Sequence, residues 1–304
     1  MPKPIRFGIV SSGAPSLDEW VALARRVEAL GYSSLLMPDR LMTPLAPWTA
    51  LATAAAATTT LRVGSHVFAN DYRHPVILAR EAATLDLLSN GRFELGLGAG
   101  VGQPDYDQMG LAFDSPGVRV SRVEEALQII KQFFTQDVVN FSGKYYTVVN
   151  LPAVPKPVQQ PHPPIFIGSS GRRMLTLAAR EADSVGPEAR PGRPGDANAD
   201  ASREEKVEWI RAAAGDRFDQ LELCQTIFDL VITDSPTPAT PPRWSNMPPR
   251  EMTIEEATAY LRGQYEQYGF SYFHASATQL ENLAPVVARL ATRSLGNADG
   301  RIPL

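Results

Sequence analysis

The chain alternates short apolar runs with amphipathic segments along its 304 residues, and this alternation narrows the choice of fold more than any other feature. The apolar runs are Ile5–Ser11, Ser34–Pro38, Leu61–Ala69, Arg92–Gly98, Pro164–Ile167, Asp183–Val185, Leu221–Ile232 and Phe270–His274. Runs that are apolar at consecutive positions suit strands of a parallel sheet that is covered on both faces. Right-handed crossover helices close eight such units into a barrel, so we predict an α/β protein with the (β/α)₈ TIM-barrel fold. An open doubly wound sheet is the main structural alternative.

The segments between the strands carry helix boundary signals. A capping box, in which a Ser or Thr hydroxyl and a Glu three residues later bond each other's backbone, precedes four of them. These boxes are Ser16–Glu19, Ser202–Glu205, Thr253–Glu256 and Thr278–Glu281. Pro75 suits a first helical turn, where its missing N–H is not needed, and Gly31 suits a helix end. The helices therefore begin and end where a barrel requires them.

Two proline-rich stretches interrupt the repeat and read as insertions after strands 4 and 7. Thr135–Pro164 contains a small predicted hairpin, Val138–Phe141 with Tyr145–Val149, and Asp234–Arg250 follows the seventh strand. No sharp change in composition divides the chain, and α/β barrels commonly exceed 250 residues. We therefore expect residues 1–304 to form a single domain.

Composition excludes several classes of function. The net charge of −4 predicts no nucleic-acid partner and no anionic membrane partner, and no apolar stretch reaches the roughly 18 residues of a membrane span. One cysteine, Cys224, allows no intrachain disulfide, and the four histidines show no paired metal-ligand spacing, so we predict no metal site. No nucleophile elbow or phosphate-binding P-loop motif occurs. We expect a cytoplasmic protein that acts on a small molecule.

Glycines gather at two strand ends, where a barrel holds its active site. Gly96-Leu-Gly-Ala-Gly-Val-Gly102 follows strand four, and Gly168-Ser-Ser-Gly171 follows strand five and precedes a helix. Gly96 and Gly98 either relieve crowding inside the barrel or let a ligand approach the backbone, whereas Ala99 and Gly100 favour ligand contact. Gly168–Gly171 suits either a phosphate cradle at a helix N-terminus or a plain N-cap turn. The first stretch is not a dinucleotide fingerprint, because its glycines alternate and Gln103-Pro-Asp-Tyr replaces an immediate helix.

Charged and titratable residues follow strands two and three. Asp39 and Arg40 come at the end of strand two, where they form either a solvated ion pair or part of a site. His66 lies inside an apolar run, and a lone histidine there is more often a satisfied core residue than an acid or base.

Together these motifs resemble the bacterial luciferase-like superfamily, and within it the deazaflavin (coenzyme F420)-dependent oxidoreductases. The segments that carry the resemblance are Ala24–Gly31, Met37–Arg40, Arg73–Pro75, Glu81–Arg92, Glu94–Gly100, Pro163–Gly171 and Ala178–Asp183. The block from Arg73 to Gly100 is the most specific of them. The resemblance is strong over residues 5–187 and weak over the C-terminal third.

The resemblance implies a flavin or deazaflavin at the C-terminal ends of the strands. It implies a non-proline cis peptide at His66–Val67, with the ring over the barrel mouth and the two insertions covering the substrate. The implied cofactor-binding residues are Asp39, Ser65, His66, Val67, Asn70, Gly98, Ala99, Gly100, Gly168, Ser169, Ser170 and Gly171. The implied catalytic residues are Asp39, Arg40 and His66. Relatives often dimerise, so a homodimer is a further expectation.

One departure from the family pattern bears on the reaction. Many relatives have Asp-His where this chain has Asp39-Arg40, and in the sugar-phosphate dehydrogenases of the family that histidine is the base. Arginine stays protonated, so a base for alcohol oxidation must come from elsewhere. We therefore predict hydride transfer between F420 and a small substrate with an activated C=C or C=N bond. The alternatives are a reduced-FMN monooxygenase and, less favoured, a non-catalytic flavoprotein.

Overall fold

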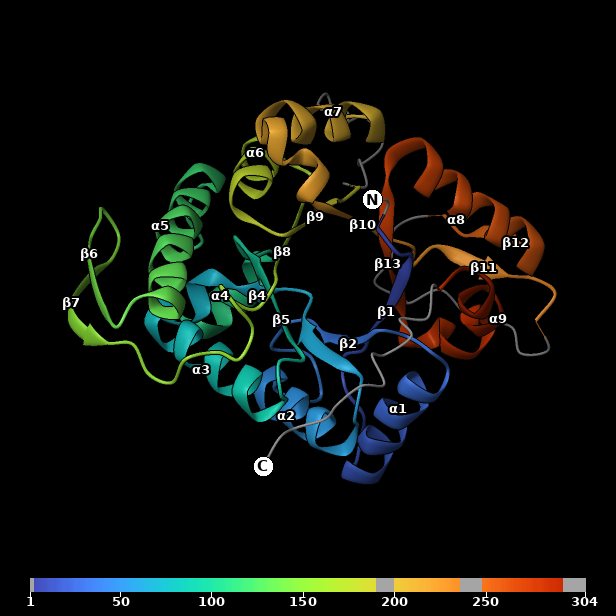
Figure 1. Cartoon of the computed structure of the whole chain (residues 1–304), viewed down its shortest axis with the longest axis horizontal. Coiled ribbons are helices and arrows are strands. Elements are labelled where there is room, and N and C mark those ends of the chain that lie inside the picture. Colours follow the sequence, from blue (N-terminus) through green and yellow to red (C-terminus); the bar gives the residue numbers. More distant parts are fainter. Residues whose placement is uncertain (1–2, 190–199, 236–247, 292–304) are drawn as a thin grey trace, which may run out of the picture.

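Parallel strands close into a barrel in the computed structural model, which describes residues 3–189, 200–235 and 248–291. Figure 1 looks into this ring of strands and its surrounding helices. The barrel strands are β1 (Arg6–Val10), β2 (Ser34–Met37), β3 (Arg62–Ser65), β5 (Phe93–Gly98), β8 (Ile165–Ser169), β9 (Ser184–Pro187), β10 (Glu222–Thr226) and β13 (Phe270–Ser276). Each pairs in parallel with its neighbours, and β13 closes the ring on β1. The predicted TIM barrel is confirmed and the open sheet is excluded.

The helices cover the outside of this barrel (Figure 1). They are α1 (Leu17–Ala29), α2 (Pro47–Ala57), α3 (Pro75–Leu88), α4 (Gln103–Met109), α5 (Pro116–Thr135), α6 (Arg172–Glu181), α7 (Arg203–Ala214), α8 (Ile254–Tyr268) and α9 (Leu280–Leu290). Three 3₁₀ turns are described as well: Asn70–Tyr72, Gly215–Gln220 and Ala277–Gln279. The apolar side chains between the strands and these helices form one continuous core. Burial of that core drives folding.

Two predicted strands are shorter than their apolar runs. The third run breaks at the His66–Val67 peptide, which is cis as the resemblance implies, and continues as β4 (Phe68–Ala69). The seventh run ends at Thr226 and resumes as β11 (Leu230–Ile232), which leaves the barrel and pairs with β12 (Arg250–Met252). Asp229 lies between the two strands, and its carboxylate forms two hydrogen bonds with Arg250 of β12, at 2.6 and 2.9 Å.

The helix caps follow the predicted pattern with one exception. Ser202–Glu205 and Thr253–Glu256 form complete capping boxes, and Ser16 accepts from the backbone N–H of Glu19. Before the last helix, the box is formed by Ser276 and Gln279 instead of Thr278 and Glu281. The carboxylate of Glu281 instead accepts a hydrogen bond from Nε of Arg26 on α1, with an Oε1–Nε distance of 2.7 Å.

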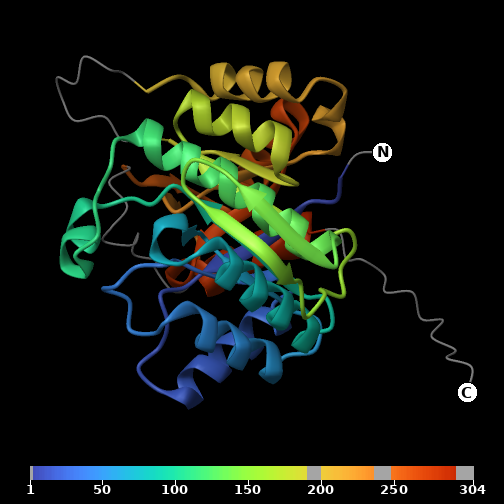
Figure 2. The same ribbon diagram turned by 90° about the vertical axis from the view of Figure 1, so that its left-hand side faces the viewer.

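The predicted hairpin forms but lies away from the barrel mouth. Strands β6 (Val138–Ser142) and β7 (Thr147–Pro152) are antiparallel and contact α5 outside the ring of helices, and in Figure 2 they face the viewer. Tyr146 anchors the hairpin by accepting a hydrogen bond from the amide of Asn70 at 3.0 Å. The stretch Thr135–Pro164 therefore does not cover the site, contrary to the prediction. Most of the other insertion, residues 236–247, lies outside the described residues.

At the N-terminal ends of the strands the barrel holds a buried ion network. The carboxylate of Glu94 accepts hydrogen bonds from Arg6 and Arg62, each at 2.6 Å, and from the hydroxyl of Tyr272 at 3.0 Å. Arg6 also forms two bonds with Glu222, at 2.7 and 2.6 Å. Burial alone would raise the pKa of Glu94, but the two arginines lower it to about 2. The charged side chains that close this end of the barrel are therefore paired with one another.

Candidate active site

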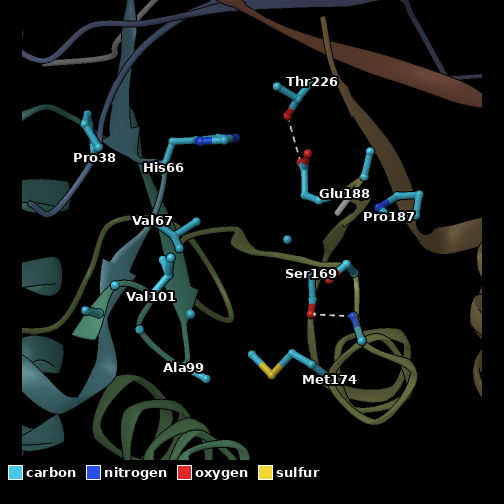
Figure 3. Close-up of a pocket in the computed structure, with 18 of the residues that line it drawn as sticks. Pro38, His66, Val67, Ala99, Val101, Ser169, Met174, Pro187, Glu188 and Thr226 are labelled. Carbon is cyan, nitrogen blue, oxygen red and sulfur yellow. Dashed lines mark hydrogen bonds between the residues drawn. The ribbon is translucent and has the colours of Figure 1, made fainter. Parts of the chain in front are cut away.

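A cavity of about 1370 Å³ opens at the other end of the barrel, where the strands end. Drug-sized ligands typically occupy pockets of about 300–1,000 Å³, so this one has room for a large ligand and a second, smaller one. Residues that follow β2, β3, β5, β8, β9 and β10 all line it. Figure 3 shows that these side chains converge from opposite sides of the barrel mouth. A shared cavity at the strand C-termini is where barrel enzymes hold their active sites.

One wall is made of backbone rather than side chains. Gly98, Ala99 and Gly100 follow β5 along the cavity, and Gly100 has a φ of +77° that favours glycine. The guanidinium of Arg119 donates to the carbonyls of Ala99, at 2.9 Å, and Gly100. A Cβ at Gly98 would lie 2.7 Å from Cγ2 of Val67, the residue after the cis peptide. The glycine stretch and the Val67 bulge therefore fit each other along one face of the cavity.

Gly96, the innermost glycine of this stretch, is needed for a different reason. A Cβ on Gly96 would overlap the carbonyl oxygen of Ser65 on the neighbouring strand, so Gly96 relieves crowding in the barrel and does not line the cavity. The prediction that no helix follows the stretch immediately is wrong, because α4 begins at Gln103. Gly102, with a φ of +89°, allows the chain to turn into that helix.

Two helix N-termini point into the cavity. The cradle Gly168–Gly171 leads into α6, and Pro116 and Gly117 begin α5 beside it. No side chain among the described residues caps the first turn of either helix. Arg173 joins them, since its guanidinium donates to the carbonyl of Gly117 at 2.7 Å and to the hydroxyl of Ser121 at 2.8 Å. Uncapped helix N-termini beside a cation form a site for an anionic group.

The neighbouring arginine takes no part in this site. The guanidinium of Arg172 lies 5.5 Å from the ring centroid of Trp209 on α7, and Arg172 does not line the cavity. Of the two arginines that begin α6, only Arg173 therefore lines the cavity.

His66 reaches the cavity from the cis bulge. Its Nε2 lies 3.1 Å from Nδ1 of His274, and its ring stacks on Phe166 at a centroid distance of 5.3 Å. Burial lowers the pKa of His66 to about 4 and lowers the pKa of His274 well below its usual range. Both imidazoles are therefore neutral near pH 7. In Figure 3 the His66 ring extends across the pocket toward the opposite wall.

Asp39 and Arg40 both line the cavity but do not pair with each other. The carboxylate of Asp39 binds Arg73, at 2.6 and 3.1 Å, and accepts from the backbone N–H of Ala69 at 3.0 Å. Arg40 instead pairs with Asp105, whose side chain is 2% exposed. Arg40 itself is 43% exposed, so its guanidinium still faces incoming ligands. The sequence alternative of a solvated Asp39–Arg40 pair is excluded.

A second carboxyl lines the opposite wall. Glu188 directly follows β9, and its Oε1 accepts a hydrogen bond from the hydroxyl of Thr226 at 2.8 Å. Removal of the carboxyl from water raises the pKa of Glu188, although the Thr226 bond and Lys206 act in the opposite direction. Glu188 and Thr226 lie across the pocket from His66 in Figure 3.

The structure brings most of the predicted site residues together. Asp39, Arg40, His66, Val67, Gly98, Ala99, Gly100, Gly168, Ser169, Ser170 and Gly171 all line the cavity. Ser65 and Asn70 do not line it: the Ser65 hydroxyl bonds both backbone groups of Gly96, at 2.8 and 3.0 Å, and Asn70 bonds Tyr146. These two residues support the wall from behind, where no ligand in the cavity would reach them.

Sequence reasoning missed Glu188 and Thr226. The available signal was position for Glu188 alone, because it closely follows the predicted strand Asp183–Val185, whereas Thr226 lay inside the predicted strand Leu221–Ile232. The Pro- and Gly-rich composition of residues 187–198 predicts a loop, and residues 190–199 lie outside the described residues.

The described ranges 3–189, 200–235 and 248–291 contain no group of three or more His, Cys, Asp or Glu side chains that could hold a metal ion. Within the same ranges, no helix is both long and apolar enough to cross a membrane.

Comparison with known proteins relates this geometry to a family. The family model described as luciferase-like monooxygenase matches residues 4–279. An F420-dependent glucose-6-phosphate dehydrogenase of Amycolatopsis mediterranei is 32% identical over 171 residues, which are 54% of this chain and 51% of that protein. The enzyme of the same name from Nakamurella multipartita is 33% identical over 200 residues, covering 60% of this chain and 56% of that protein. The chain thus spans about half the length of the curated relatives it matches.

Solved structures share the fold at low sequence identity. The F420-dependent tetrahydromethanopterin reductase of Methanopyrus kandleri superposes with a TM-score of 0.76 at 17% identity, covering 95% of this chain and 99% of that chain. A riboflavin lyase with modified FMN superposes with a TM-score of 0.78 at 16% identity, covering 95% of this chain and 93% of that one. At such identities the likeness shows the fold alone.

Proposed function

The chain belongs to the luciferase-like monooxygenase family, and from that premise we propose that it is an F420-dependent oxidoreductase acting on a small organic molecule. The substrate carries an activated C=C or C=N bond that exchanges a hydride with the cofactor. When bound, the deazaflavin supplies or accepts that hydride, and the protein supplies position and electrostatics.

The anion site between α5 and α6 is the observation that carries the proposal. F420 has a polyanionic tail, whereas FMN has one phosphate. The N-terminus of α5, the Gly168–Gly171 cradle and Arg173 offer more anion-binding capacity than one phosphate requires. Arg173 is 55% exposed, so a ligand can reach its guanidinium, although the carboxylate of Glu124 lies 3.9 Å from it. The F420-dependent relatives support the same choice.

The backbone wall fits a flat ring. Val67 and the bare backbone at Gly98–Gly100 would hold one edge of the cofactor, and a Cβ at Gly98 would disturb this fit. His66 is neutral, so it binds by hydrogen bonding and stacking and places no positive charge beside the ring. Arg40 is paired with Asp105 but 43% exposed, so it would orient an anionic or carbonyl oxygen of the substrate, and it cannot act as a base.

The test is a binding titration of the purified full chain against F420 and against FMN, each oxidised and reduced. We expect F420 to bind at least tenfold more tightly than FMN, because its tail uses the anion site. Tight binding of reduced FMN alone would overturn the proposal in favour of an FMN-dependent monooxygenase. Binding of neither cofactor would overturn both enzymatic functions.

A further inference from the structure

On the opposite wall of the cavity, the carboxyl of Glu188 lies against strand positions that carry no side chain. Glu188 folds against Gly168 and Gly186, which are register partners on β8 and β9. A Cβ on Gly186 would lie 3.0 Å from Oε1 of Glu188, and a Cβ on Gly168 would lie 3.4 Å from its Cγ. Two neighbouring strands thus both lack side chains where this carboxyl lies. The arrangement holds Glu188 in the cavity.

The groups around Glu188 do not hold its carboxyl in the ionised form. From α7, the buried Lys206 bonds the backbone carbonyl of Glu188 at 2.8 Å and the carboxylate of Asp200 at 2.6 Å. From β10, Thr226 donates one hydrogen bond and Cys224 lies deeper in the barrel, uncharged because burial raises its pKa. His66 faces from across the cavity and is neutral. No ion pair to the Glu188 carboxyl is found among the described residues.

We propose that Glu188 is the residue that exchanges a proton with the substrate, and that the substrate is an α,β-unsaturated carbonyl compound. The inference rests on the proposed function and specifies its substrate class. Hydride transfer to a C=C bond requires one proton in addition, and Arg40 cannot supply one on each turnover because it stays protonated. An imine that reacts as its iminium brings its own proton. Conjugated carbonyl compounds therefore need this carboxyl most.

The step balances with the groups named. The β-carbon of the substrate takes the hydride of the reduced deazaflavin, the π electrons shift to the carbonyl oxygen, and that oxygen takes the carboxyl proton of Glu188. The resulting enol converts to the saturated ketone in solvent. The Glu188 carboxylate regains a proton from water, and the second proton of the reduced cofactor would pass to water. In the reverse direction Glu188 takes the proton.

The first measurement concerns protonation alone and needs no turnover. Infrared difference spectra of the full chain, wild type minus Glu188→Gln, isolate the C=O stretch of a protonated carboxyl. We expect this band to persist above about pH 4.3, the ordinary glutamic acid pKa. Thr226→Val removes the bond that favours the carboxylate, so the band should persist to still higher pH. Titration at or below the ordinary value would overturn the proposal.

The second measurement follows single-turnover oxidation of reduced F420 by 2-cyclohexen-1-one. We expect Glu188→Gln to bind F420 within about twofold of wild type and to slow the reaction by about 10²-fold, a typical size for acid catalysis. The wild-type rate should fall as pH rises through the pKa of Glu188, Glu188→Gln should lose this limb, and Glu188→Asp should restore it in part. Glu208→Gln, an exposed acid on α7, is the matched control and should behave as wild type.

The outcomes separate the two proposals. Failure of the wild type to bind F420 would overturn the proposed function and leave the infrared result to stand alone. Binding of F420 with an unchanged pH limb in Glu188→Gln would overturn only the role of Glu188. Binding of F420 without any reduction of the enone would overturn the substrate class and the proton-exchange role with it.

Discussion

Two glutamates inside the same barrel have opposite surroundings. Glu94, at the closed end, is held by Arg6 and Arg62, and these arginines lower its pKa to about 2 against the effect of burial. Glu188, at the open end, has one hydroxyl as its hydrogen-bond partner, and its withdrawal from water raises its pKa. Burial acts on both carboxyls in the same direction. The difference lies in whether a guanidinium is within bonding distance.

The comparison separates stability from chemistry. A buried carboxylate whose charge is matched contributes to the closed end of the barrel, where mutations change the stability of the fold. A carboxyl with a raised pKa at the open end keeps its proton to higher pH than an ordinary glutamic acid, which suits a proton donor. The four predictions below test this division, beginning with the largest expected effect.

The largest effect should come from Glu94→Gln. Among the described residues, the variant leaves Arg62 without a carboxylate partner and Arg6 with Glu222 alone, and breaking a buried pair of this kind typically costs about 3 kcal/mol or more. Urea denaturation should show that loss in the free energy of unfolding, whereas Glu188→Gln should remain close to wild type. If both variants lost equal stability, the two ends of the barrel would not differ in the way we describe.

The pH dependence of stability should have opposite signs for the two groups. The depressed pKa of Glu94 gives stability that is present above its unfolded pKa, about 4.3, and is lost as pH falls toward 2. The raised pKa of Glu188 gives a smaller contribution that is present at low pH and is lost as pH rises through its folded-state pKa. Thermal melts of wild type, Glu94→Gln and Glu188→Gln across pH measure both. Glu94→Gln should lack the loss of stability at low pH and keep the loss that accompanies rising pH, and Glu188→Gln should show the reverse.

A third prediction concerns the cofactor wall at the open end. Gly98→Ala puts a Cβ 2.7 Å from Val67, and overpacking of this kind costs about 1–3 kcal/mol. Because Val67 faces the cavity, we expect F420 binding to weaken about tenfold or more while Glu188 titrates as before. Isothermal calorimetry and the infrared band measure the two effects separately. A variant with unchanged affinity would show that the ring does not rest on this wall.

The smallest effect should distinguish two adjacent arginines. Arg173→Gln removes a cation from the anion site, so F420 should bind about two- to fivefold more weakly at low salt, with the difference shrinking as salt rises. Arg172→Gln is the matched control, because Arg172 stacks on Trp209 and should not alter binding. Equal effects of the two variants would indicate general charge attraction, and the anion site would lose its support.

Some of the site could be read from particular residues. Gly100 and Gly168–Gly171 stand directly after apolar runs, and parallel strands place such positions at the same end of a barrel. The resemblance located the cis peptide at His66–Val67, which the structure contains. Ser65 and Asn70 show the limit of this reasoning, because they lie next to cavity residues in sequence but their side chains turn toward Gly96 and Tyr146. Neighbours along a strand point to opposite sides.

By itself, the sequence determined the barrel, the order of its strands and the glycine-lined face of the site, because these depend on local periodicity and on residues close together in the chain. Only the tertiary structure decided which charges meet. Asp39 binds Arg73 instead of Arg40, Arg40 binds Asp105, and Glu188 meets Thr226 from the next strand. These partners lie from 34 to 65 residues apart, so only barrel closure brings them within hydrogen-bonding distance of each other.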